Sequence, residues 1–240
     1  MRIAGMQPYF LPYLGYWQLI HSVDLFILGD DFQYMNDGWI NRNRFLKQDG
    51  GWFYLTLPVQ KHSMREQIRN IQLPPQVSLY KLLNNALIQY RCRGRAPYFD
   101  EIYALLLDTV KQIETKQISR INEVLIRAIC TYLEINTEIK VMSESGLKFR
   151  EEQSPDDRTR ELCSFFHGTE YTNPIAGVHL YDPATFRSSG LKLKALQSHE
   201  IIYAQRDGFE PSLSIVDVLM YNGRSGTQAL LEACTVTEII

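Results

Sequence analysis

The chain has 240 residues, of which 45% are hydrophobic and 22% charged, and its formal net charge is −2. This length suits one sizeable domain or two small ones, with a core that folds without disulfides or a structural metal. The balance of 25 Lys and Arg against 27 Asp and Glu argues against a nucleic-acid-binding protein. The chain has neither an apolar run of about 18–20 residues nor an N-terminal signal region, so we expect a cytoplasmic protein without a membrane span.

The start of the chain predicts a strand, a rigid loop, a helix and a second strand. Residues 2–6 are apolar enough for a buried strand, and two prolines make 7–13 a rigid loop. A helix should follow over about 13–22, since Pro12 suits a first-turn position. The apolar run within 24–30 predicts a strand buried on both faces, as in a parallel sheet. Together these elements form a βαβ unit with a right-handed crossover.

The remaining elements follow from apolar spacing and turn residues. Residues 36–52 are polar and turn-rich and predict a loop, and 60–69 form a basic loop. Further strands are expected at 52–59, 68–73, 139–142, 170–173, 191–196 and 201–203. Further helices are expected at 79–90, 97–110, 118–133, 158–166, 183–188 and 213–219.

This order of elements predicts an α/β fold with a parallel-sheet core and a mainly helical insert at about 76–135. The N-terminal α/β half, 1–75, would carry the pocket loops, and the C-terminal α/β half would span 136–240. We expect the three parts to form one compact unit.

The first candidate site lies where two predicted parallel strands end. Ligands of open α/β sheets bind at the carboxyl ends of the strands, and the segments 7–13 and 30–34 both follow strands. Aromatic side chains on such loops can also cap a core. Here they occur beside polar groups, which favours a pocket. The side chains predicted to line it are Gln7, Tyr9, Tyr13, Asp30 and Gln33.

A second candidate site is the segment Trp39–Arg44. The Arg42 guanidinium matches a phosphate or carboxylate, and Asn41 and Asn43 can point the same way if the segment is extended. The alternative is a solvated loop with a capping Asn. Lys61, in the basic loop, would either clamp the same anion or be solvated.

A third candidate set lies later in the chain. Arg158 stands at the start of a predicted helix, and helix N-termini attract anions. Tyr171, Asn173 and Gln205 follow as further binding candidates. The five histidines and four cysteines show no metal-ligand spacing, and the common nucleotide and hydrolase motifs are absent, so we predict no metal site and name no cofactor.

Several blocks resemble one protein family along nearly the whole chain. The segment Met6–Tyr16, MQPYFLPYLGY, resembles the opening signature of the WbqC-like family. Further blocks that agree with it are Trp39–Asn43, Leu55–Val59, Phe209–Asp217 and Asn222-Gly223.

The resemblance implies a bacterial enzyme of surface-polysaccharide (O-antigen) biosynthesis, which transfers an amino acid (glycine) or acyl group to a nucleotide-linked amino sugar. In this hypothesis Tyr13, Gly15 and Tyr16 line an anion site. Asp30 would be the general base if the acceptor is an amine. The alternative is a non-catalytic protein of the same pathway that binds a glycan or nucleotide sugar. Both readings imply a small-molecule substrate and no nucleic acid, and both leave the oligomeric state open.

A more distant likeness concerns the start of the first helix. Tyr13-Leu14-Gly15-Tyr16 is similar in position to the H-x-G-H motif of the nucleotidylyltransferase-like superfamily, which implies a Rossmann-like, HUP-type core. Gly15 matches, whereas tyrosines replace both histidines. Tyrosine donates a hydrogen bond but carries no positive charge. The departure therefore argues against adenylyl transfer and favours binding of a nucleotide or activated acyl group at this helix end.

Overall fold

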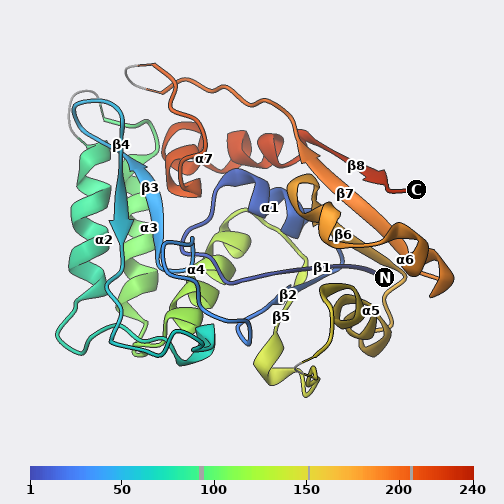
Figure 1. Cartoon of the computed structure of the whole chain (residues 1–240). Helices are drawn as coiled ribbons and strands as arrows, with labels where there is room; N and C mark the ends of the chain where they lie inside the picture. Colours follow the sequence, from blue (N-terminus) through green and yellow to red (C-terminus); the bar gives the residue numbers. More distant parts are fainter. Residues whose placement is uncertain (92–94, 151, 206–207) are drawn as a thin grey trace.

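The computed structural model describes residues 1–91, 95–150, 152–205 and 208–240. Within these residues the chain forms an α/β fold around a six-stranded, mostly parallel sheet (Figure 1). All its strands run parallel except the last, which pairs antiparallel at one edge. In their order across the sheet, the strands are β5 (Glu138–Val141), β2 (Leu25–Leu28), β1 (Arg2–Met6), β6 (Glu170–Pro174), β7 (Lys192–Ser198) and β8 (Cys234–Glu238).

Helices cover both faces of the sheet because alternate strand residues point to opposite sides. Ala4 and Phe26 belong to the larger hydrophobic core, with α1 (Leu14–His21), α4 (Ile118–Tyr132) and α7 (Ile215–Leu231). Ile3 and Leu25, their neighbours along the strands, belong to a second core with α5 (Pro155–Phe165) and α6 (Pro183–Ser188). Burial on both faces explains the continuous apolar run of β2.

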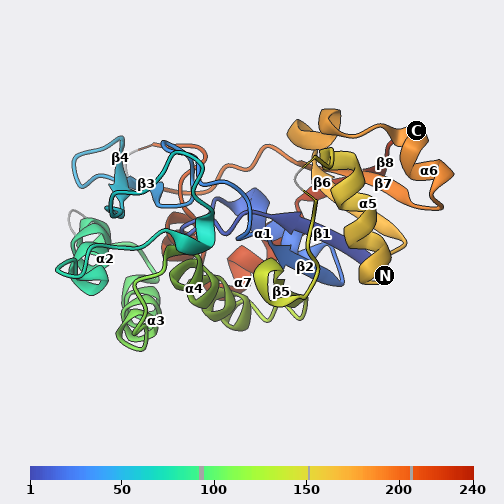
Figure 2. The same ribbon diagram turned by 60° about the horizontal axis from the view of Figure 1, so that its bottom comes forward.

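The connection from β2 to β5 carries a hairpin and a group of helices. Strands β3 (Arg42–Leu46) and β4 (Trp52–Thr56) pair antiparallel and lie, with α2 (Leu79–Leu87) and α3 (Phe99–Lys111), at the opposite end of the molecule from α5 and α6 (Figure 2). The short 3-10 helices are η1 (Ile68–Asn70), η2 (Ile88–Tyr90), η3 (Met142–Glu144) and η4 (Ile175–Leu180).

Several predicted elements are wrong in type. The predicted strand at 68–73 is the helix η1 and a single bridge from Gln72 to Gln117, since its backbone pairs with the turn before α4. The predicted strand at 201–203 is irregular, and there the Tyr203 hydroxyl bonds Asp217 instead.

Two strands were not predicted. Strand β3 lies inside the predicted loop at 36–52, because its outward positions carry arginines and read as polar. Strand β8 is an exposed edge strand with few buried side chains, so it shows no strong hydrophobic pattern.

Candidate functional site

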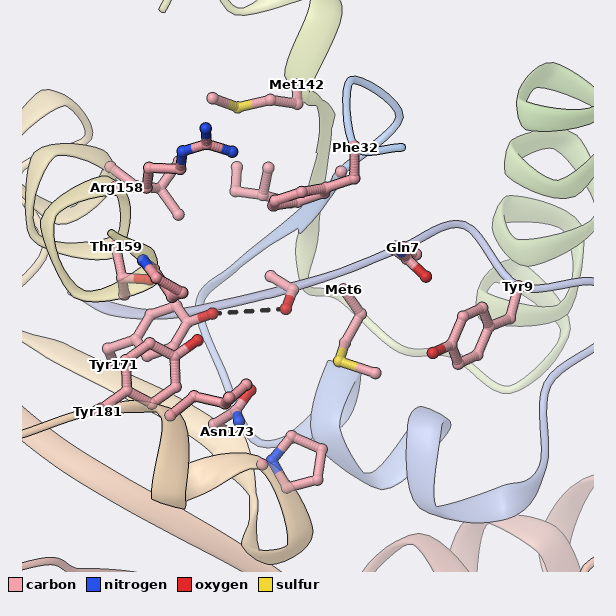
Figure 3. A pocket seen from close by; sticks show the side chains of 18 of the residues that line it. Met6, Gln7, Tyr9, Phe32, Met142, Arg158, Thr159, Tyr171, Asn173 and Tyr181 are labelled. Carbon is pink, nitrogen blue, oxygen red and sulfur yellow. Dashed lines mark hydrogen bonds between the residues drawn. The ribbon is translucent and has the colours of Figure 1, made fainter. Parts of the chain in front are cut away.

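The direction of the strand order changes between β1 and β6, and a cavity of about 540 Å³ opens at their carboxyl ends. Such a switch point is where open α/β sheets bind ligands. The cavity wall comes from the segments after β1, β2, β5 and β6 and from the first turns of α5 (Figure 3). Its main polar and aromatic side chains are Gln7, Tyr9, Tyr13, Phe32, Trp39, Phe149, Arg158, Thr159, Tyr171, Asn173 and Tyr181.

Arg158 is the one charged side chain among the described residues that line the cavity. It lies one turn into α5, whose N-cap Ser154 accepts a hydrogen bond from the Asp157 amide. Its Nη2 donates to the Arg150 oxygen at 3.4 Å, and its guanidinium carbon lies 5.8 Å from the ring centroid of Phe149. The guanidinium and the partial positive charge of the helix N-terminus both favour an anion here.

A group of tyrosines supplies hydroxyl donors to the cavity. The Tyr171 hydroxyl donates to the Gly5 oxygen at 3.5 Å, and its ring packs edge-on against Tyr181 at 5.7 Å between centroids (Figure 3). Burial raises the pKa of Tyr171 well above its usual value, and also raises the pKa values of Tyr9 and Tyr13. These phenols therefore stay protonated near neutral pH, and the hydroxyls of Tyr9 and Tyr13 can donate to a bound oxygen.

The described cavity wall contains no Cys, Ser, His, Lys, Asp or Glu side chain. Cys163 lies in the neighbouring core, and burial raises the pKa of its thiol to about 12, which keeps it protonated and unreactive. The described wall residues can bind and orient a ligand through hydrogen bonds, one positive charge and aromatic contacts.

The loop 7–13, which forms one side of the cavity, is fixed through its main-chain oxygens. Among the donors are the Tyr16 hydroxyl to Gln7 at 2.9 Å, Asn122 Nδ2 to Pro8 at 2.7 Å and Trp17 Nε1 to Pro12 at 3.0 Å. Leu11 adopts a φ of 44°, a conformation that a non-glycine residue keeps only when its surroundings hold it. The loop therefore presents Tyr9 and Tyr13 from a rigid backbone.

The cavity brings together part of the predicted site. Six of the predicted residues line it, on opposite sides as Figure 3 shows for most of them. They are Gln7, Tyr9, Tyr13, Arg158, Tyr171 and Asn173.

The predicted general base, Asp30, does not line this cavity. Its side chain is buried, and its carboxylate accepts hydrogen bonds from the Ser143 amide at 2.9 Å and the Ser143 hydroxyl at 2.7 Å. It thereby ties the end of β2 to the end of β5. Its role as a base stays a prediction.

The predicted anion site at the start of α1 is divided by the fold. Tyr16 is buried, with its hydroxyl on the Gln7 oxygen, and its ring contacts Tyr9 and Phe26. Gly15 faces a second cavity beside residues 198–203 and 211–213, and a Cβ at Gly15 would collide with the Tyr13 ring. Of the three residues, only Tyr13 lines the main cavity.

The segment Trp39–Arg44 uses its polar side chains within the protein. Asn41 Nδ2 donates to the Leu57 oxygen at 2.8 Å, and Asn43 Nδ2 donates to Phe10 and Leu11. Arg42 forms an ion pair with Asp37 at 2.9 Å. None of these three lines the main cavity.

The last three predicted residues also lie elsewhere. Gln33 Nε2 donates to the Met64 oxygen at 2.8 Å, and Lys61 is exposed on its loop. Gln205 Nε2 donates to Asp217 Oδ2 at 2.6 Å in a network with Tyr203. Binding through these residues stays a prediction.

Several wall residues were not among the predicted site residues. Met142 and Phe149 follow β5. They were missed because the expectation that ligands bind at the carboxyl ends of parallel strands was applied only to the first two strands. Phe32 lies in the 30–34 segment, but only polar residues of that segment were selected as binding candidates. Thr159 could have been found from Arg158, which precedes it on the same helix.

Comparison with known proteins places the chain in a family. The model of the WbqC-like protein family matches residues 7–229. The chain belongs to the WbqC-like family. This WbqC-like protein is 28% identical over 232 residues to an uncharacterized protein, Rv1507c, of Mycobacterium tuberculosis, and the match covers 92% of this chain and 94% of that protein. No solved structure is significantly similar to it. None of the described helices combines the length and apolar character needed to cross a membrane.

Proposed function

We propose that the main cavity binds a nucleotide-linked amino sugar, and that the protein transfers an amino acid (glycine) or acyl group to it in bacterial surface-polysaccharide (O-antigen) biosynthesis. The observation that carries the proposal is Arg158, a lone charged group among the described wall residues of an aromatic cavity. Such a wall suits a ligand with a flat or apolar body and an anionic group. The reversal of strand order at β1 and β6 supports a Rossmann-like, HUP-type core.

The chemistry of this proposal needs no nucleophile from the protein. The amine of the sugar attacks the carbonyl carbon of an activated donor, the leaving group departs with its bonding electrons, and the proton that the amine loses passes to the leaving group or to water. The wall residues contribute by holding donor and acceptor together, which lowers the activation free energy by about several kcal/mol or more. Protonated tyrosine hydroxyls, such as those of Tyr9 and Tyr13, can donate to the oxygen that gains negative charge.

A non-catalytic protein that binds a glycan or nucleotide sugar is the second candidate. The observation that favours it is the absence of an acid, base or nucleophile other than tyrosine and threonine hydroxyls among the described wall residues. This candidate predicts binding of the sugar nucleotide without turnover.

The test compares two arginines of α5. Arg158 lines the cavity, whereas Arg160 points elsewhere and pairs with Asp157 at 2.5 Å. Calorimetric titration with UDP-N-acetylglucosamine should show roughly 10- to 100-fold weaker binding for Arg158→Ala and little change for Arg160→Ala, since a charge-assisted hydrogen bond contributes about 1.5–3 kcal/mol.

Turnover separates the two candidates. Incubation of UDP-glucosamine, whose 2-amine is free, with glycine and ATP, or with glycyl thioester, should yield an N-glycylated product by mass spectrometry if the protein is a transferase. Binding without product supports the non-catalytic candidate. If Arg158→Ala binds a panel of nucleotide-linked amino sugars as the wild type does, the cavity assignment is wrong.

A further inference from the structure

The outward face of the β3–β4 hairpin combines arginines with aromatic rings. Arg44 pairs with Tyr54 across the two strands, and Trp52 pairs with Leu46 on the same face. Trp39 and Tyr54 are 36% and 41% exposed. The ring centroids lie 5.0 Å apart for Trp52 and Tyr54 and 6.3 Å apart for Trp39 and Tyr54, so the rings form one continuous surface.

Arg44 is held within this surface. Its guanidinium carbon lies 5.2 Å from the Trp52 ring centroid and 5.7 Å from that of Trp39. Its Nη2 donates to the Ser212 oxygen at 2.8 Å, and its own main-chain oxygen accepts from the Ser214 amide at 2.9 Å. The side chain is therefore fixed in position before any ligand arrives.

The charge of Arg44 is not balanced by an acid within the described part of the chain. Arg42, two residues earlier on the same face, pairs with Asp37, whereas no ion pair of Arg44 occurs among the described residues. The Nε atom of Arg44, like that of Arg42, is buried and has no acceptor among the described residues. A partly buried guanidinium with unused donors is costly, and an oxyanion would offset that cost.

A small cavity of about 160 Å³ lies beside this guanidinium. It is lined by Tyr13, Trp39, Asn43, Arg44 and Ser212. Tyr13 and Trp39 also line the main cavity, so the two cavities share a wall. A ligand in the main cavity that extends past Tyr13 and Trp39 would enter the small cavity beside Arg44.

We propose that Arg44, with Trp39 and Trp52, forms a second anion-binding subsite that takes an oxyanion, either a phosphate of the sugar nucleotide or the carboxylate of the free amino acid before it is activated. The subsite extends the ligand site of the proposed function and rests on it for the identity of the ligand. Arg158 and Arg44 would then bind different groups at the inner and outer parts of one site. Arg42 plays no part in this subsite, because Asp37 already balances its charge.

Tryptophan fluorescence tests the subsite directly. Trp39 and Trp52 contact Arg44, and the third tryptophan, Trp17, is fully buried. Titration with pyrophosphate and, separately, with N-acetylglycine at constant ionic strength should give a saturable change in emission with the anion that fits. A response to pyrophosphate would indicate that the subsite binds a phosphate group, and a response to N-acetylglycine would indicate that it binds a carboxylate.

The variants decide the assignment. Arg44→Ala should weaken the anion response roughly tenfold or more, and the matched control Arg42→Ala should leave it within about twofold. If Arg44→Ala is less stable, Arg44→Lys decides instead: it keeps the charge but loses the planar fork, so the response should weaken. An unchanged response in these Arg44 variants, or no saturable response to either anion in the wild type, overturns the proposal.

Arg158→Ala separates this proposal from the proposed function. It should leave the tryptophan response to the small anion within about twofold, since Arg158 does not line the small cavity. Loss of the response only in Arg158→Ala would overturn the Arg44 subsite and support the main cavity. Loss only in the Arg44 variants, with normal sugar-nucleotide binding by Arg158→Ala, would support the subsite and overturn the role of Arg158.

Discussion

The side-chain nitrogen of Asn43 lies 2.8 Å from the main-chain oxygen of Leu11, and this contact joins strand β3 to the loop after β1. The same nitrogen donates to the Phe10 oxygen at 3.0 Å, and Asn43 Oδ1 accepts from the Arg44 amide at 2.8 Å. The Ser214 hydroxyl also donates to Leu11 at 2.7 Å. The hairpin and the start of α7 therefore hold the backbone on which Tyr9 and Tyr13 stand.

Replacement of Asn43 by Ala should destabilise the protein more than it perturbs any ligand contact. The Phe10 and Leu11 oxygens lose the Asn43 amide, and Leu11 keeps the Ser214 hydroxyl. Because the Asn43 side chain is only 2% exposed, we expect the free energy of unfolding to fall by about 2–4 kcal/mol. Urea unfolding measures the loss. Gln33→Ala, which removes an exposed amide, should change it by less than about 1 kcal/mol. An unfolding midpoint for Asn43→Ala equal to that of the wild type would contradict the bracing role.

Asp30 and Ser143 form a clamp between the ends of β2 and β5, and their variants should behave alike. Asp30→Asn loses an acceptor for one of the two Ser143 donors, and Ser143→Ala removes the hydroxyl. We expect each to lower the free energy of unfolding by about 1–3 kcal/mol, measured by urea unfolding.

The double variant of this pair gives the sharper measurement. Since the two residues act through one contact, the double variant should lose less than the sum of the single losses. Strictly additive losses would show that they act independently. An Asp30→Asn variant with wild-type stability but no turnover would instead support the predicted role as general base.

The sequence predicted the parallel strands and most helices because burial leaves a periodic apolar pattern. Strand β2 is buried at all four positions, and that pattern needs no knowledge of its neighbours. Strand β3 does not show this pattern, because its outward face carries Arg42 and Arg44. Their guanidinium groups pack on the rings of Tyr54 and Trp52 in the neighbouring strand. The pairing of β3 depends on tertiary contacts that a local pattern does not contain.

The candidate site was predicted where the chain topology alone decides position. Gln7 and Tyr9 follow β1, and the rule that ligands bind at the carboxyl ends of parallel strands predicted them together. Tyr171 and Asn173 lie in β6 and were predicted as a separate set, which the fold brings to the same cavity. Asn43 shows the limit of this reasoning, because an amide looks the same in sequence whether its acceptor is a ligand or a loop oxygen. Only the folded chain reveals that the acceptor is Leu11.

Gly177 controls the position of the Asn173 amide in the cavity. A Cβ at Gly177 would collide with Asn173 Nδ2, so Gly177→Ala should displace that amide. We expect about 2- to 10-fold weaker binding of UDP-N-acetylglucosamine in calorimetric titration, the effect of losing one neutral hydrogen bond.

The double variant Gly177→Ala/Asn173→Ala tests the mechanism behind this effect. If Gly177 acts only through Asn173, the double variant should bind no more weakly than Asn173→Ala alone. A further loss in the double variant would mean that the glycine contacts the ligand itself.

Asp217 should make the protein less stable as the pH rises from about 4 to 6. Burial raises its pKa from 3.8 to about 6, although side-chain hydrogen bonds from Tyr203, Gln205 and Tyr90 favour the ionised form. The folded state therefore binds the proton more tightly than the unfolded state, and this stabilisation is lost as the pH passes through the folded-state pKa.

The variant Asp217→Asn removes this titration. We expect its free energy of unfolding to rise relative to the wild type by about 2 kcal/mol between pH 4 and pH 7, measured by urea unfolding at each pH. Glu114→Gln, at an exposed site, should show no such trend, and parallel pH profiles for Asp217→Asn and the wild type would contradict the assignment.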